Sequence, residues 1–557
     1  MTVGGSAMAL IDTRREQMFP VLTGPQIDTA RRFASGDERH FEPGELVFDV
    51  GDVNASAWLV LEGSIAVLQR DGRGIETPIT TECAGQFSGE VSQLSGKPSL
   101  VLGRAGTEGA KAVPYDAPHL RALVIGSADV GEVVMRAFIL RRVGLIEATG
   151  SGSVLIGRLD ARELVRLQGF LTRNGYPVTV LDAAAEEGRE LIERFGVLPD
   201  ELPLMLCPNG TVLKRPSDAE AAVCLGITPD LDPGKIYDVA VVGAGPAGLA
   251  TAVYAASEGL SVLVLDQRAI GGQAGASARI ENYLGFPTGI SGQALAGRAF
   301  SQAQKFGAEI ALPLEVDRLF CEDAETTVKV RLSGDGGTVQ ARTVVIASGV
   351  RYRRPEIENL SAFEGAGVSY WASPVEAKLC EGEEVALIGA GNSAGQAVVF
   401  LAPKVKRLHL MVRGEGLEAS MSRYLIDRIH ALPNVEMHTH SEVIALEGDK
   451  AQGLEKAVFR NSQTGQEHSC DLRHLFLFTG ADPNTGWLEG CTALDPKGFV
   501  VTGEDAALPL QTSLPNVFAI GDVRCGSTKR VAAAVGEGAA VVAQIHTVLA
   551  AMNERAS

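Results

Sequence analysis

Short alternating segments of apolar and polar residues make up the chain from Phe41 to about Val124. Glycine-containing turns punctuate FEPGELVFDVGD, AWLVLEGSIAVLQRDGRG and ITTECAGQFSGEVSQLSG. Short strands with turn signals at this spacing predict a small antiparallel barrel or jelly roll. The apolar stretch 131–148 that follows predicts a helix.

A second pattern, in which strands alternate with helices, runs from about Ser153 to Ile227. SVLIGRL and YPVTVLDA predict strands, ARELVRLQGFLTRNG and AEEGRELIERFGV predict helices, and LPLMLCPNGTVLKRP predicts a hairpin. This βαβαββ order is that of the thioredoxin fold. Two prolines and a glycine in TPDLDPGK then predict a linker, which we place at 229–236.

From Tyr237 onward, a strand, a glycine-rich turn, a helix and a strand occur twice in this order, which is typical of α/β nucleotide-binding domains. The first turn contains Gly243, Gly245 and Gly248. These glycines permit the tight turn, the approach of a pyrophosphate to the helix N-terminus, and close packing of helix on strand, respectively. Asp266 lies 23 residues after Gly243, where a carboxylate can accept hydrogen bonds from a ribose diol.

The second turn has Gly389, Gly391 and Ala394 in the three glycine positions. The residue 23 positions after Gly389 is Val412, and Arg413 follows it. A carboxylate for a free 2′-hydroxyl is therefore missing, whereas Arg413 can pair with a 2′-phosphate. The pattern favours NADPH over NADH. The alternative is that Arg413 is a solvated arginine at a strand end.

Composition narrows the class of protein. A chain of 557 residues is longer than one hydrophobic core usually serves, and 45% hydrophobic with 21% charged residues indicates a folded globular protein. A net charge of −18 argues against nucleic acid or an anionic membrane as a partner.

The N-terminal segment MTVGGSAMALIDTRREQ lacks the apolar core of a signal peptide, and polar residues interrupt the apolar region 531–552. We therefore expect a cytoplasmic protein with no membrane span. None of the eight cysteines forms a CxxC motif, so their spacing predicts neither a metal site nor a redox dithiol. Scattered thiols agree with a reducing compartment.

Residues 237–557 resemble the low-molecular-weight thioredoxin reductase family. The matching segments, in chain order, are GGQAGASARIENYLGFPTGISG, the Ala347 to Gly349 turn, GAGNSA, FTGADPNTGWL and GDVRCGSTKRVAAAVGEG. The resemblance implies an enzyme that binds FAD and NADPH in two domains, the second inserted into the first. The implied FAD residues are Gly243, Gly245, Pro246, Ala247, Gly248, Asp266, Gly272, Gln273, Asn282, Gly521, Asp522 and Arg530, and the implied NADP residues are Gly389, Gly391, Asn392, Ser393 and Arg413.

The chain departs from this family where the reaction is completed. The cysteines of the family's YCATCDG segment carry electrons from flavin to thioredoxin, and residues 370–376 match it with YWASPVE. Trp371 and Pro374 stand at the two cysteine positions, and neither can replace a thiolate in thiol exchange. We expect Trp371 to pack near the flavin. Cys380 and Cys525 are the alternative redox candidates, although free cysteines more often fill apolar cores.

Two further departures concern charge. Only Arg413 matches one of the three arginines in the family's HRRxxxR segment, so NADH is kept as the second nicotinamide cofactor. The family's RQ pair after GD aligns with Lys529 and Arg530. We expect Arg530 to lie near the pyrimidine edge of the flavin, where its cation would stabilise the anionic reduced ring.

The N-terminal barrel resembles the cyclic-nucleotide-binding domain family through FEPGELVF, LEGSIAV and the segment SGEVSQLSGKPSL, in which Gly89 and Glu90 match the ribose-contacting pattern. Ser99 replaces the arginine that normally meets the cyclic phosphate. A lost charge-assisted pair of about 1.5–3 kcal/mol argues against nucleotide binding and favours a structural or docking role.

The thioredoxin-like segment also lacks its motif, because GRLDAR at 157–162 occupies the place of CxxC. Pro203 is the expected cis-proline of that fold, and Cys207 is expected to stand alone. We therefore expect docking or dimer contact from this segment and no electron relay.

These patterns predict an α/β protein with two Rossmann-like dinucleotide-binding domains, preceded by a β-barrel domain and a thioredoxin-like domain. The predicted limits are 1–150 for the barrel, 151–228 for the thioredoxin-like domain, 229–236 for the linker, 237–350 with 481–557 for the FAD domain and 351–480 for the NAD(P)H domain.

The predicted activity is transfer of hydride from NADPH to FAD and of electrons to an external acceptor, which the sequence does not identify. Two alternatives stay open: a disulfide reductase that uses the flavin directly or an atypical cysteine, and a flavin-based redox sensor regulated through the barrel. The resemblance also implies a homodimer.

Overall fold

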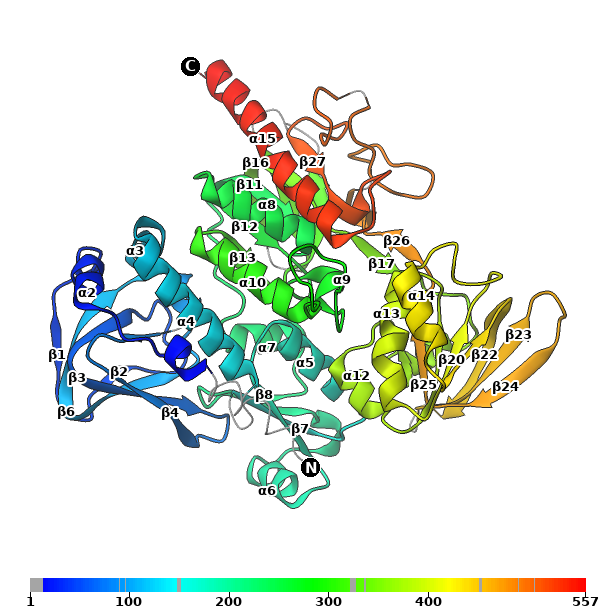
Figure 1. Cartoon of the computed structure of the whole chain (residues 1–557), viewed down its shortest axis with the longest axis horizontal. Coiled ribbons are helices and arrows are strands. Elements are labelled where there is room, and N and C mark those ends of the chain that lie inside the picture. Colours follow the sequence, from blue (N-terminus) through cyan, green and yellow to red (C-terminus); the bar gives the residue numbers. More distant parts are fainter. Residues whose placement is uncertain are drawn as a thin grey trace.

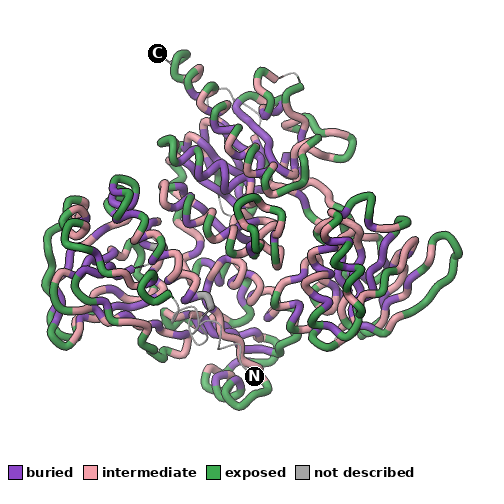
Figure 2. Tube along the Cα trace, in the orientation of Figure 1, coloured by how far each residue is buried: buried purple, intermediate pink, exposed green. Residues whose placement is uncertain are grey.

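The computed structural model describes residues 14–89, 91–95, 97–147, 152–320, 327–334, 337–449, 453–488, 490–504 and 506–556. Figure 1 shows four groups of strands and helices arranged around a central region. The first group lies on the left, the second at the bottom, the third at the top and the fourth on the right. Figure 2 shows that buried residues are concentrated in the strands and facing helices within each group.

The first group is built on a six-stranded antiparallel sheet of order β1-β6-β3-β4, with β2 paired to β6 and β5 to β3. Its two longest strands, β3 and β6, pair with each other, and buried residues alternate with less buried ones along the second half of β3. The predicted helix at 131–148 is α4, and its last residue lies outside the described part. The elements are α2 (Gly24–Arg31), β1 (Arg39–Phe41), β2 (Leu46–Phe48), β3 (Ala57–Arg70), β4 (Glu76–Cys83), β5 (Phe87–Ser88), η1 (Val91–Leu94), β6 (Leu102–Tyr115), α3 (Ala117–Gly126) and α4 (Ala128–Glu147).

The second group follows the predicted strand and helix order, and its sheet has the order β10-β9-β7-β8. The Leu202–Pro203 peptide bond is cis, as expected for Pro203. The elements are β7 (Ser153–Gly157), α5 (Arg162–Arg173), β8 (Val178–Asp182), α6 (Glu186–Arg194), η2 (Pro199–Glu201), β9 (Leu204–Leu206), β10 (Val212–Lys214) and α7 (Asp218–Cys224).

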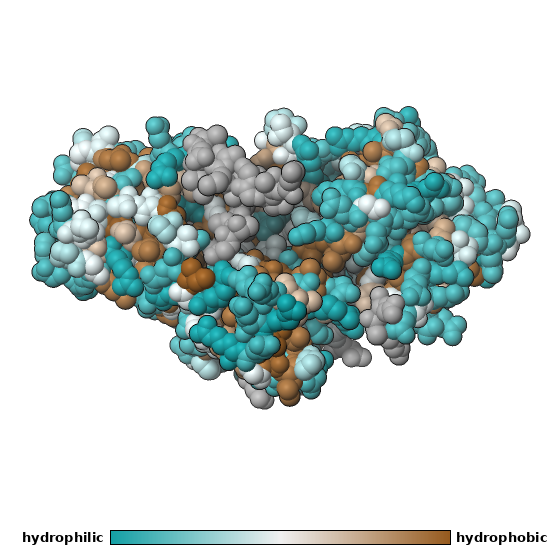
Figure 3. Space-filling model, turned by 90° about the horizontal axis from the view of Figure 1, so that it is seen from below, coloured by the Kyte–Doolittle hydropathy of each residue, from teal (hydrophilic) through white to brown (hydrophobic). Residues whose placement is uncertain are grey.

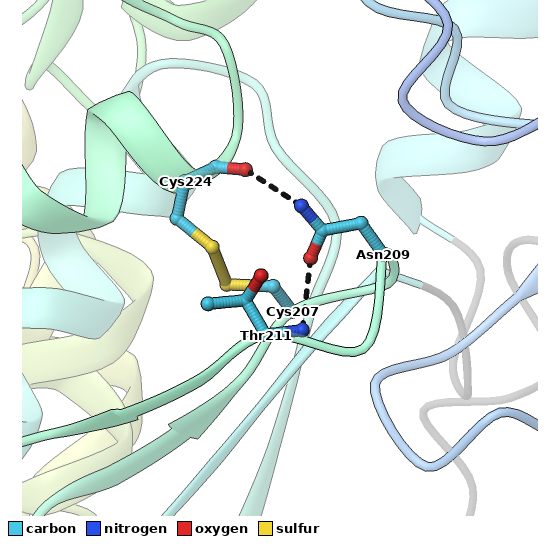
Figure 4. Close-up of a disulfide and its surroundings, with 4 residues drawn as sticks. All are labelled: Cys207, Asn209, Thr211 and Cys224. Atoms are coloured by element: carbon cyan, nitrogen blue, oxygen red, sulfur yellow. Dashed lines mark hydrogen bonds between the residues drawn. A yellow bond between two sulfur atoms is a disulfide. The ribbon is translucent and has the colours of Figure 1, made fainter.

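One expectation about this group is wrong. Cys207, expected to stand alone, forms a disulfide with Cys224, the last residue of α7. Figure 4 shows Asn209 beside this bond, with its Nδ2 donating to the carbonyl oxygen of Cys224 at 3.4 Å and its Oδ1 accepting from the backbone N–H of Thr211 at 3.0 Å. A spacing of 17 residues, outside any local motif, concealed the pairing from the sequence.

The third group contains a seven-stranded sheet with a parallel core, β13-β12-β11-β16, extended by antiparallel β15 and β14, while β27 pairs in parallel with β16. Strand β11 ends in a run of four buried residues because both faces of the sheet are covered. The elements are β11 (Ile236–Val242), α8 (Pro246–Ser257), β12 (Val262–Leu265), α9 (Gly272–Gly275), α10 (Gly292–Lys305), β13 (Glu309–Ala311), β14 (Val316–Phe320), β15 (Val328–Leu332), β16 (Thr338–Ile346), η4 (Gly486–Leu488), β27 (Val517–Ala519), η5 (Gly521–Val523) and α15 (Val531–Ala556).

The fourth group has a parallel sheet of order β18-β25-β19-β20-β21 and a three-stranded antiparallel sheet of order β22-β23-β24. Its elements are α11 (Leu360–Phe363), β18 (Val368–Ser369), α12 (Pro374–Leu379), β19 (Glu384–Ile388), α13 (Asn392–Leu401), η3 (Ala402–Lys404), β20 (Arg407–Met411), α14 (Arg423–His430), β21 (Val435–His438), β22 (Ser441–Asp449), β23 (Gly453–Asn461), β24 (Glu467–Asp471) and β25 (His474–Leu477).

A two-stranded antiparallel connection joins the third and fourth groups. It pairs β17 (Val350–Tyr352) with β26 (Ala481–Pro483), and Tyr352 lies opposite Ala481. The parallel, helix-covered sheets on either side confirm the predicted Rossmann-like α/β architecture of the C-terminal part. The predicted domain limits and the two N-terminal fold assignments stay predictions.

Helix α15 is long and apolar enough over Val531–Arg555 to cross a membrane by length and composition alone. It packs against α8, where Thr251 donates to the carbonyl oxygen of Gly538 at 3.3 Å and Val541 and Ile545 are fully buried. One face of this helix is therefore packed against the rest of the protein. Seen from the side of the second group, the surface is mainly hydrophilic, with separate apolar patches (Figure 3).

Candidate functional site

The first glycine-rich turn has the geometry that its sequence predicts. Gly243 has φ +116°, and a Cβ there would lie 2.2 Å from the carbonyl oxygen of Ala347. A Cβ on Gly248 would lie 1.9 Å from the carbonyl oxygen of Gly243, so helix and strand pack as closely as expected. Gly245, the N-cap of α8, has no neighbouring atom within 4 Å of the position that a Cβ would take, so its outer side is open. Pro246 and Ala247 form the first turn of α8.

Asp266 follows β12, and its carboxylate accepts hydrogen bonds from the backbone of the surrounding loops. Its Oδ2 accepts from the backbone N–H of Ala244 at 2.8 Å, while Oδ1 accepts from those of Arg268 at 2.8 Å and Ala269 at 3.1 Å. The carboxylate therefore stands beside the turn at the end of β11, as the predicted ribose contact requires. Its hydrogen bonds also give it a second function, which is to fix the shape of that turn.

The glycine pair after Asp266 packs on the first turn. Gly272 has φ +54°, and a Cβ there would lie 3.1 Å from the Cα of Gly245. Gln273 donates through Nε2 to the carbonyl oxygen of Val350, which joins this loop to the connection between the two nucleotide-binding units. Asn282, also predicted to line the flavin, is exposed.

The C-terminal part completes the same region. Gly521 has φ +70°, and a Cβ there would lie 2.9 Å from that of Ala247, which places η5 against the start of α8. Burial raises the pKa of Asp522, and the Lys529 ammonium, which donates to its carbonyl oxygen at 2.5 Å, opposes that rise. Arg530 is exposed and donates to the carbonyl oxygen of Lys529 at 3.3 Å.

The second glycine-rich turn repeats the first. Gly389 has φ +149°, and a Cβ there would lie 2.8 Å from the carbonyl oxygen of Phe478 and 2.9 Å from the Cβ of Ala394. Gly391 caps α13 and, like Gly245, is open on its outer side. Both turns therefore present an open helix N-terminus at the carboxyl edge of a parallel sheet, the arrangement that binds a pyrophosphate.

The predicted NADP residues surround this second turn. Asn392 accepts through Oδ1 from the backbone N–H of Ser422 at 2.8 Å, and Ser393 is exposed. Arg413 is exposed just beyond β20 and forms no ion pair with any residue in the described part of the chain. Its guanidinium is therefore available to an anionic ligand.

The segment that bears Trp371 is fixed by one carboxylate. The indole Nε1 of Trp371 donates to Oε1 of Glu376 at 2.9 Å, and Oε2 of Glu376 accepts from the backbone N–H of Ser373 at 3.0 Å. Ser373 is the N-cap of α12, and Pro374 is its first residue. Pro374 fits there because the first helical position needs no N–H donor.

The two candidate cysteines lie in different environments and are not brought together. Cys380 is fully buried in the core to which β19 and α13 contribute, and burial raises the pKa of its thiol to about 11. The thiol of Cys525 donates to Oδ2 of Asp495 at 3.4 Å, and this hydrogen bond to a carboxylate raises its pKa. A raised thiol pKa disfavours the nucleophilic thiolate at both positions.

Two residues that the sequence did not suggest join these sites. Arg173, at the end of α5, donates to the carbonyl oxygen of Gly272 at 3.0 Å. Burial lowers its pKa, while the charges of Asp266 and Glu376 act in the opposite direction. Arg173 therefore joins the second group to the predicted flavin loop.

Tyr352 lies on the connecting strand β17. Burial raises the pKa of its hydroxyl, a side-chain hydrogen bond with Ser393 opposes the rise, and the charge of Asp522 adds to it. Tyr352 therefore contacts Ser393, one of the predicted NADP residues, from the connecting strand. Its extended, mostly polar strand carries no motif, so no local signal marked it.

Residues 237–538 match the model of the pyridine nucleotide-disulphide oxidoreductase family. The chain belongs to this family. The match spans both glycine-rich turns, and the open helix N-termini, the left-handed glycines and the polar donors around them fit two dinucleotides. This oxidoreductase is thus an NAD(P)H-dependent FAD enzyme, with FAD and NADPH as its cofactors.

Comparison with known proteins places the C-terminal part of the oxidoreductase beside thioredoxin reductases. It is 33% identical over 310 residues to the thioredoxin reductase of Mycoplasmopsis pulmonis, which covers 55% of this chain and 94% of that protein. It is 34% identical over 309 residues to the F component of the alkyl hydroperoxide reductase of Pseudomonas putida, which covers 55% of this chain but only 56% of that protein.

Solved structures agree with this placement. The Lactococcus lactis thioredoxin reductase in its FR conformation superposes with a TM-score of 0.52 at 25% identity and covers 56% of this chain and 99% of that one. The T. acidophilum thioredoxin reductase gives a TM-score of 0.51 at 28% identity and covers 56% of this chain and 98% of that one. These matches cover the C-terminal part of the oxidoreductase.

Proposed function

We propose that this oxidoreductase uses NADPH to reduce its FAD and delivers the electrons to an acceptor outside the chain, without a cysteine pair at 371–374. The observation that carries the proposal is the environment of Trp371 and Pro374. An indole held by Glu376 and a proline at the start of α12 occupy the positions where the resembling reductases have their cysteines.

Three of the four free thiols in the described residues support this proposal. Cys380 is buried with a pKa of about 11, and the pKa values of Cys470 and Cys525 are raised as well. Thiol exchange needs a thiolate, and burial or a neighbouring carboxylate opposes its formation. None of these three thiols is poised to replace the missing pair.

The protein's contribution is then to bind and orient the two dinucleotides, since the flavin and the nicotinamide supply the hydride and electron chemistry when bound. The open turns at Gly245 and Gly391 would hold the two pyrophosphates, and Arg413 would pair with the 2′-phosphate that distinguishes NADPH from NADH. Asp522 and Arg530 are proposed to face the FAD.

The decisive experiment mixes the purified yellow protein anaerobically with NADPH or NADH and then adds quinones, dioxygen or oxidised thioredoxin. We expect NADPH to bleach the flavin and a non-thiol acceptor to restore its colour repeatedly. Failure of both nucleotides to bleach the flavin refutes the assigned cofactor use. Turnover of oxidised thioredoxin refutes the proposed absence of disulfide chemistry, and turnover that persists in a Cys380→Ser, Cys525→Ser variant shows that neither cysteine is needed for it.

One observation favours a second function, reduction of disulfides. The Cys207–Cys224 bond lies in the second group, which also docks on the flavin loop through Arg173. If this bond accepts electrons, anaerobic titration will consume two equivalents of NADPH per FAD, and a Cys207→Ser, Cys224→Ser variant will consume one. One equivalent in the unchanged protein favours our first proposal.

The N-terminal group is proposed to serve in docking and not in cyclic-nucleotide binding. Ser99 is buried and donates through its hydroxyl to the carbonyl oxygen of Val101 at 2.8 Å, so no cation stands at this position. Arg141 of α4 instead supports the preceding segment by donating to the carbonyl oxygen of Gly89 at 2.9 Å. Glu90 lies outside the described residues. An unchanged melting temperature with cyclic AMP or cyclic GMP is expected.

The homodimer that the resemblance implies and the cytoplasmic location remain part of this proposal. Light scattering on the purified holoprotein is expected to give a mass of two chains. A mass of one chain contradicts the dimer but leaves the cofactor assignment unaffected.

A further inference from the structure

Three metal-ligating side chains meet on the fourth group, outside the dinucleotide sites. His409 comes from β20, and Glu436 and His438 come from the neighbouring strand β21. Nδ1 of His409 lies 3.2 Å from Nε2 of His438 and 3.9 Å from Oε2 of Glu436. Nε2 of His438 lies 3.8 Å from Oε1 of Glu436.

Strand register explains why these side chains meet. In the parallel pair β20–β21, His409 is aligned with Glu436, and Met411 with His438. Residues two apart on a strand point to the same face, so Glu436 and His438 share a face with each other and with His409. Met411 belongs to the buried cluster that includes Val443 and Phe459 of β22 and β23, so this is the face that the three-stranded sheet covers.

The covering sheet encloses the cluster on one side. The ring of His468, on β24, lies 5.5 Å from the ring of His438 and 5.6 Å from that of Phe459. His409 has a side chain only 8% exposed, whereas Glu436 is 52% exposed. The cluster therefore combines a buried imidazole, that of His409, with a solvent-exposed carboxylate, that of Glu436. Solvent can reach the cluster from the side of Glu436.

The donor set and its spacing fit a tetrahedral transition-metal ion. Two imidazole nitrogens and a carboxylate oxygen are ligands that Zn²⁺ takes readily. With metal–ligand bonds of about 2.0–2.1 Å, ligand atoms in a tetrahedron lie about 3.3 Å apart. The two nitrogens lie 3.2 Å apart, and His409 and His438 lie 3.9 and 3.8 Å from different oxygens of Glu436. One ligand atom from each residue can be chosen so that all three lie within 4.8 Å of one another, and a rotation of the Glu436 carboxylate would bring one oxygen closer to both nitrogens.

A second carboxylate stands behind the buried histidine. Oε2 of Glu384 lies 3.6 Å from Nε2 of His409, the ring nitrogen that faces away from the cluster. Metal-bound histidines usually direct their other nitrogen to a carboxylate, which fixes the tautomer and strengthens the ligand. Lys406 and Arg407 pair with Glu384 and Glu436, respectively, and Arg407 is the cation that a metal would displace from Glu436.

We propose that His409, Glu436 and His438 form a binding site for one Zn²⁺ ion per chain, with water as the fourth ligand. The site joins two strands at the edge of the sheet and is independent of the proposed electron transfer. Cysteine spacing predicted no metal site, and this one has no cysteine ligand. Its signal in the sequence is the alternation of Glu436 and His438 on one strand, which has meaning only once β20 is placed beside it.

The test uses the full-length FAD-loaded protein, freed of metal with a chelator and then titrated with Zn²⁺ against a chromogenic zinc indicator. We expect one Zn²⁺ per chain, and at least tenfold weaker binding in His409→Gln and in His438→Gln. His430→Gln, which alters an exposed histidine on α14, and His468→Gln are expected to bind within threefold of the unchanged protein. Stoichiometric binding that survives His438→Gln overturns the proposal, as does a lack of binding by the unchanged protein.

A second measurement decides the matter if the variants fold poorly, which flavin content and melting temperature of the metal-free proteins will reveal. Co²⁺ replaces Zn²⁺ in tetrahedral sites and absorbs at longer wavelengths than the flavin. We expect the unchanged protein to develop this band with one equivalent of Co²⁺ and to lose it when Zn²⁺ is added. Absence of the band overturns the proposed site.

Discussion

The indole of Trp371 donates its hydrogen bond to the same carboxylate, Glu376, that closes the N-terminal cap of α12. One side chain therefore fixes both the orientation of the tryptophan and the start of the helix. Because Glu376 is 7% exposed, neither bond is easily replaced by water. Loss of this carboxylate is therefore expected to affect both the orientation of Trp371 and the start of α12.

Replacing Glu376 by alanine is expected to release Trp371 and to destabilise the protein by about 1–2 kcal/mol, because a buried hydrogen bond and a helix cap are lost together. The emission of Trp371, isolated by subtracting the spectrum of a Trp371→Phe variant, is expected to shift to longer wavelength. Glu376→Gln keeps one carbonyl acceptor and is the matched control. An unchanged emission in Glu376→Ala contradicts the prediction.

Two glycines of the first turn are expected to have different roles, Gly243 in folding and Gly245 in FAD binding. Gly243→Ala is expected to destabilise the fold, because φ +116° strains any other residue by about 1–3 kcal/mol and the new Cβ meets a carbonyl oxygen. Gly245→Ala meets no protein atom, so it is expected to fold within about 0.5 kcal/mol of the original yet bind FAD at least tenfold more weakly. Calorimetry and flavin absorbance distinguish the two, and equal behaviour refutes the assignment.

Arg413 is expected to set the choice of nicotinamide cofactor. Arg413→Ala removes a charge-assisted contact of about 1.5–3 kcal/mol, which corresponds to a rise of about 10- to 100-fold in KM for NADPH with little change for NADH. Arg460→Ala, on β23 of the same unit, serves as the control for a lost surface arginine. If both nucleotides are affected equally, Arg413 does not contact the 2′-phosphate.

The thiol of Cys380 is expected to resist alkylation. With a pKa of about 11, only about one thiol in a thousand is ionised at pH 8, and burial hinders reagents further. Mass spectrometry after brief treatment with iodoacetamide should find Cys83, which is exposed, modified at least 100-fold faster. Rapid labelling of Cys380 in the folded protein would favour the disulfide-reductase alternative.

Lys97 is expected to make the free energy of unfolding depend on pH under alkaline conditions. Burial, aided by the charge of Arg142, lowers its pKa from 10.5 to about 8. Between pH 8 and pH 10.5 the unfolded chain then binds more protons than the folded chain, so this residue makes the unfolding free energy rise with pH across that window and contributes no slope below it. Denaturant titrations of Lys97→Met should lack this contribution, and an identical pH profile contradicts it.

The sequence predicted the parts of the fold and of the site that depend on local chain geometry. Gly243 and Gly389 were recognisable because a strand, a tight turn and a helix lie within a few residues of each. The cis-proline at Pro203 was expected from the resemblance of its segment to the thioredoxin fold. Trp371 and Pro374 were recognisable by position, but their shared dependence on Glu376 was seen only in three dimensions.

The rest depends on contacts between residues far apart in the chain. Arg173 reaches the flavin loop from another group of elements, and Cys207 pairs with Cys224 across a hairpin and a helix. The cluster of His409, Glu436 and His438 requires two strands to be placed side by side in a known register. No spacing rule for a single segment contains that information.

The pairing of β17 with β26 brings together the two ends of the chain segment that forms the fourth group. Tyr352 and Ala481 lie opposite each other, so the chain leaves the third group, the predicted FAD domain, and returns to it at neighbouring points. A segment whose two ends meet can be cut out and the gap rejoined by a short turn without moving the strands on either side. A shortened chain lacking residues 353–480 is therefore expected to retain flavin while losing its response to NADPH. The predicted NAD(P)H domain could then be removed without loss of the predicted FAD domain.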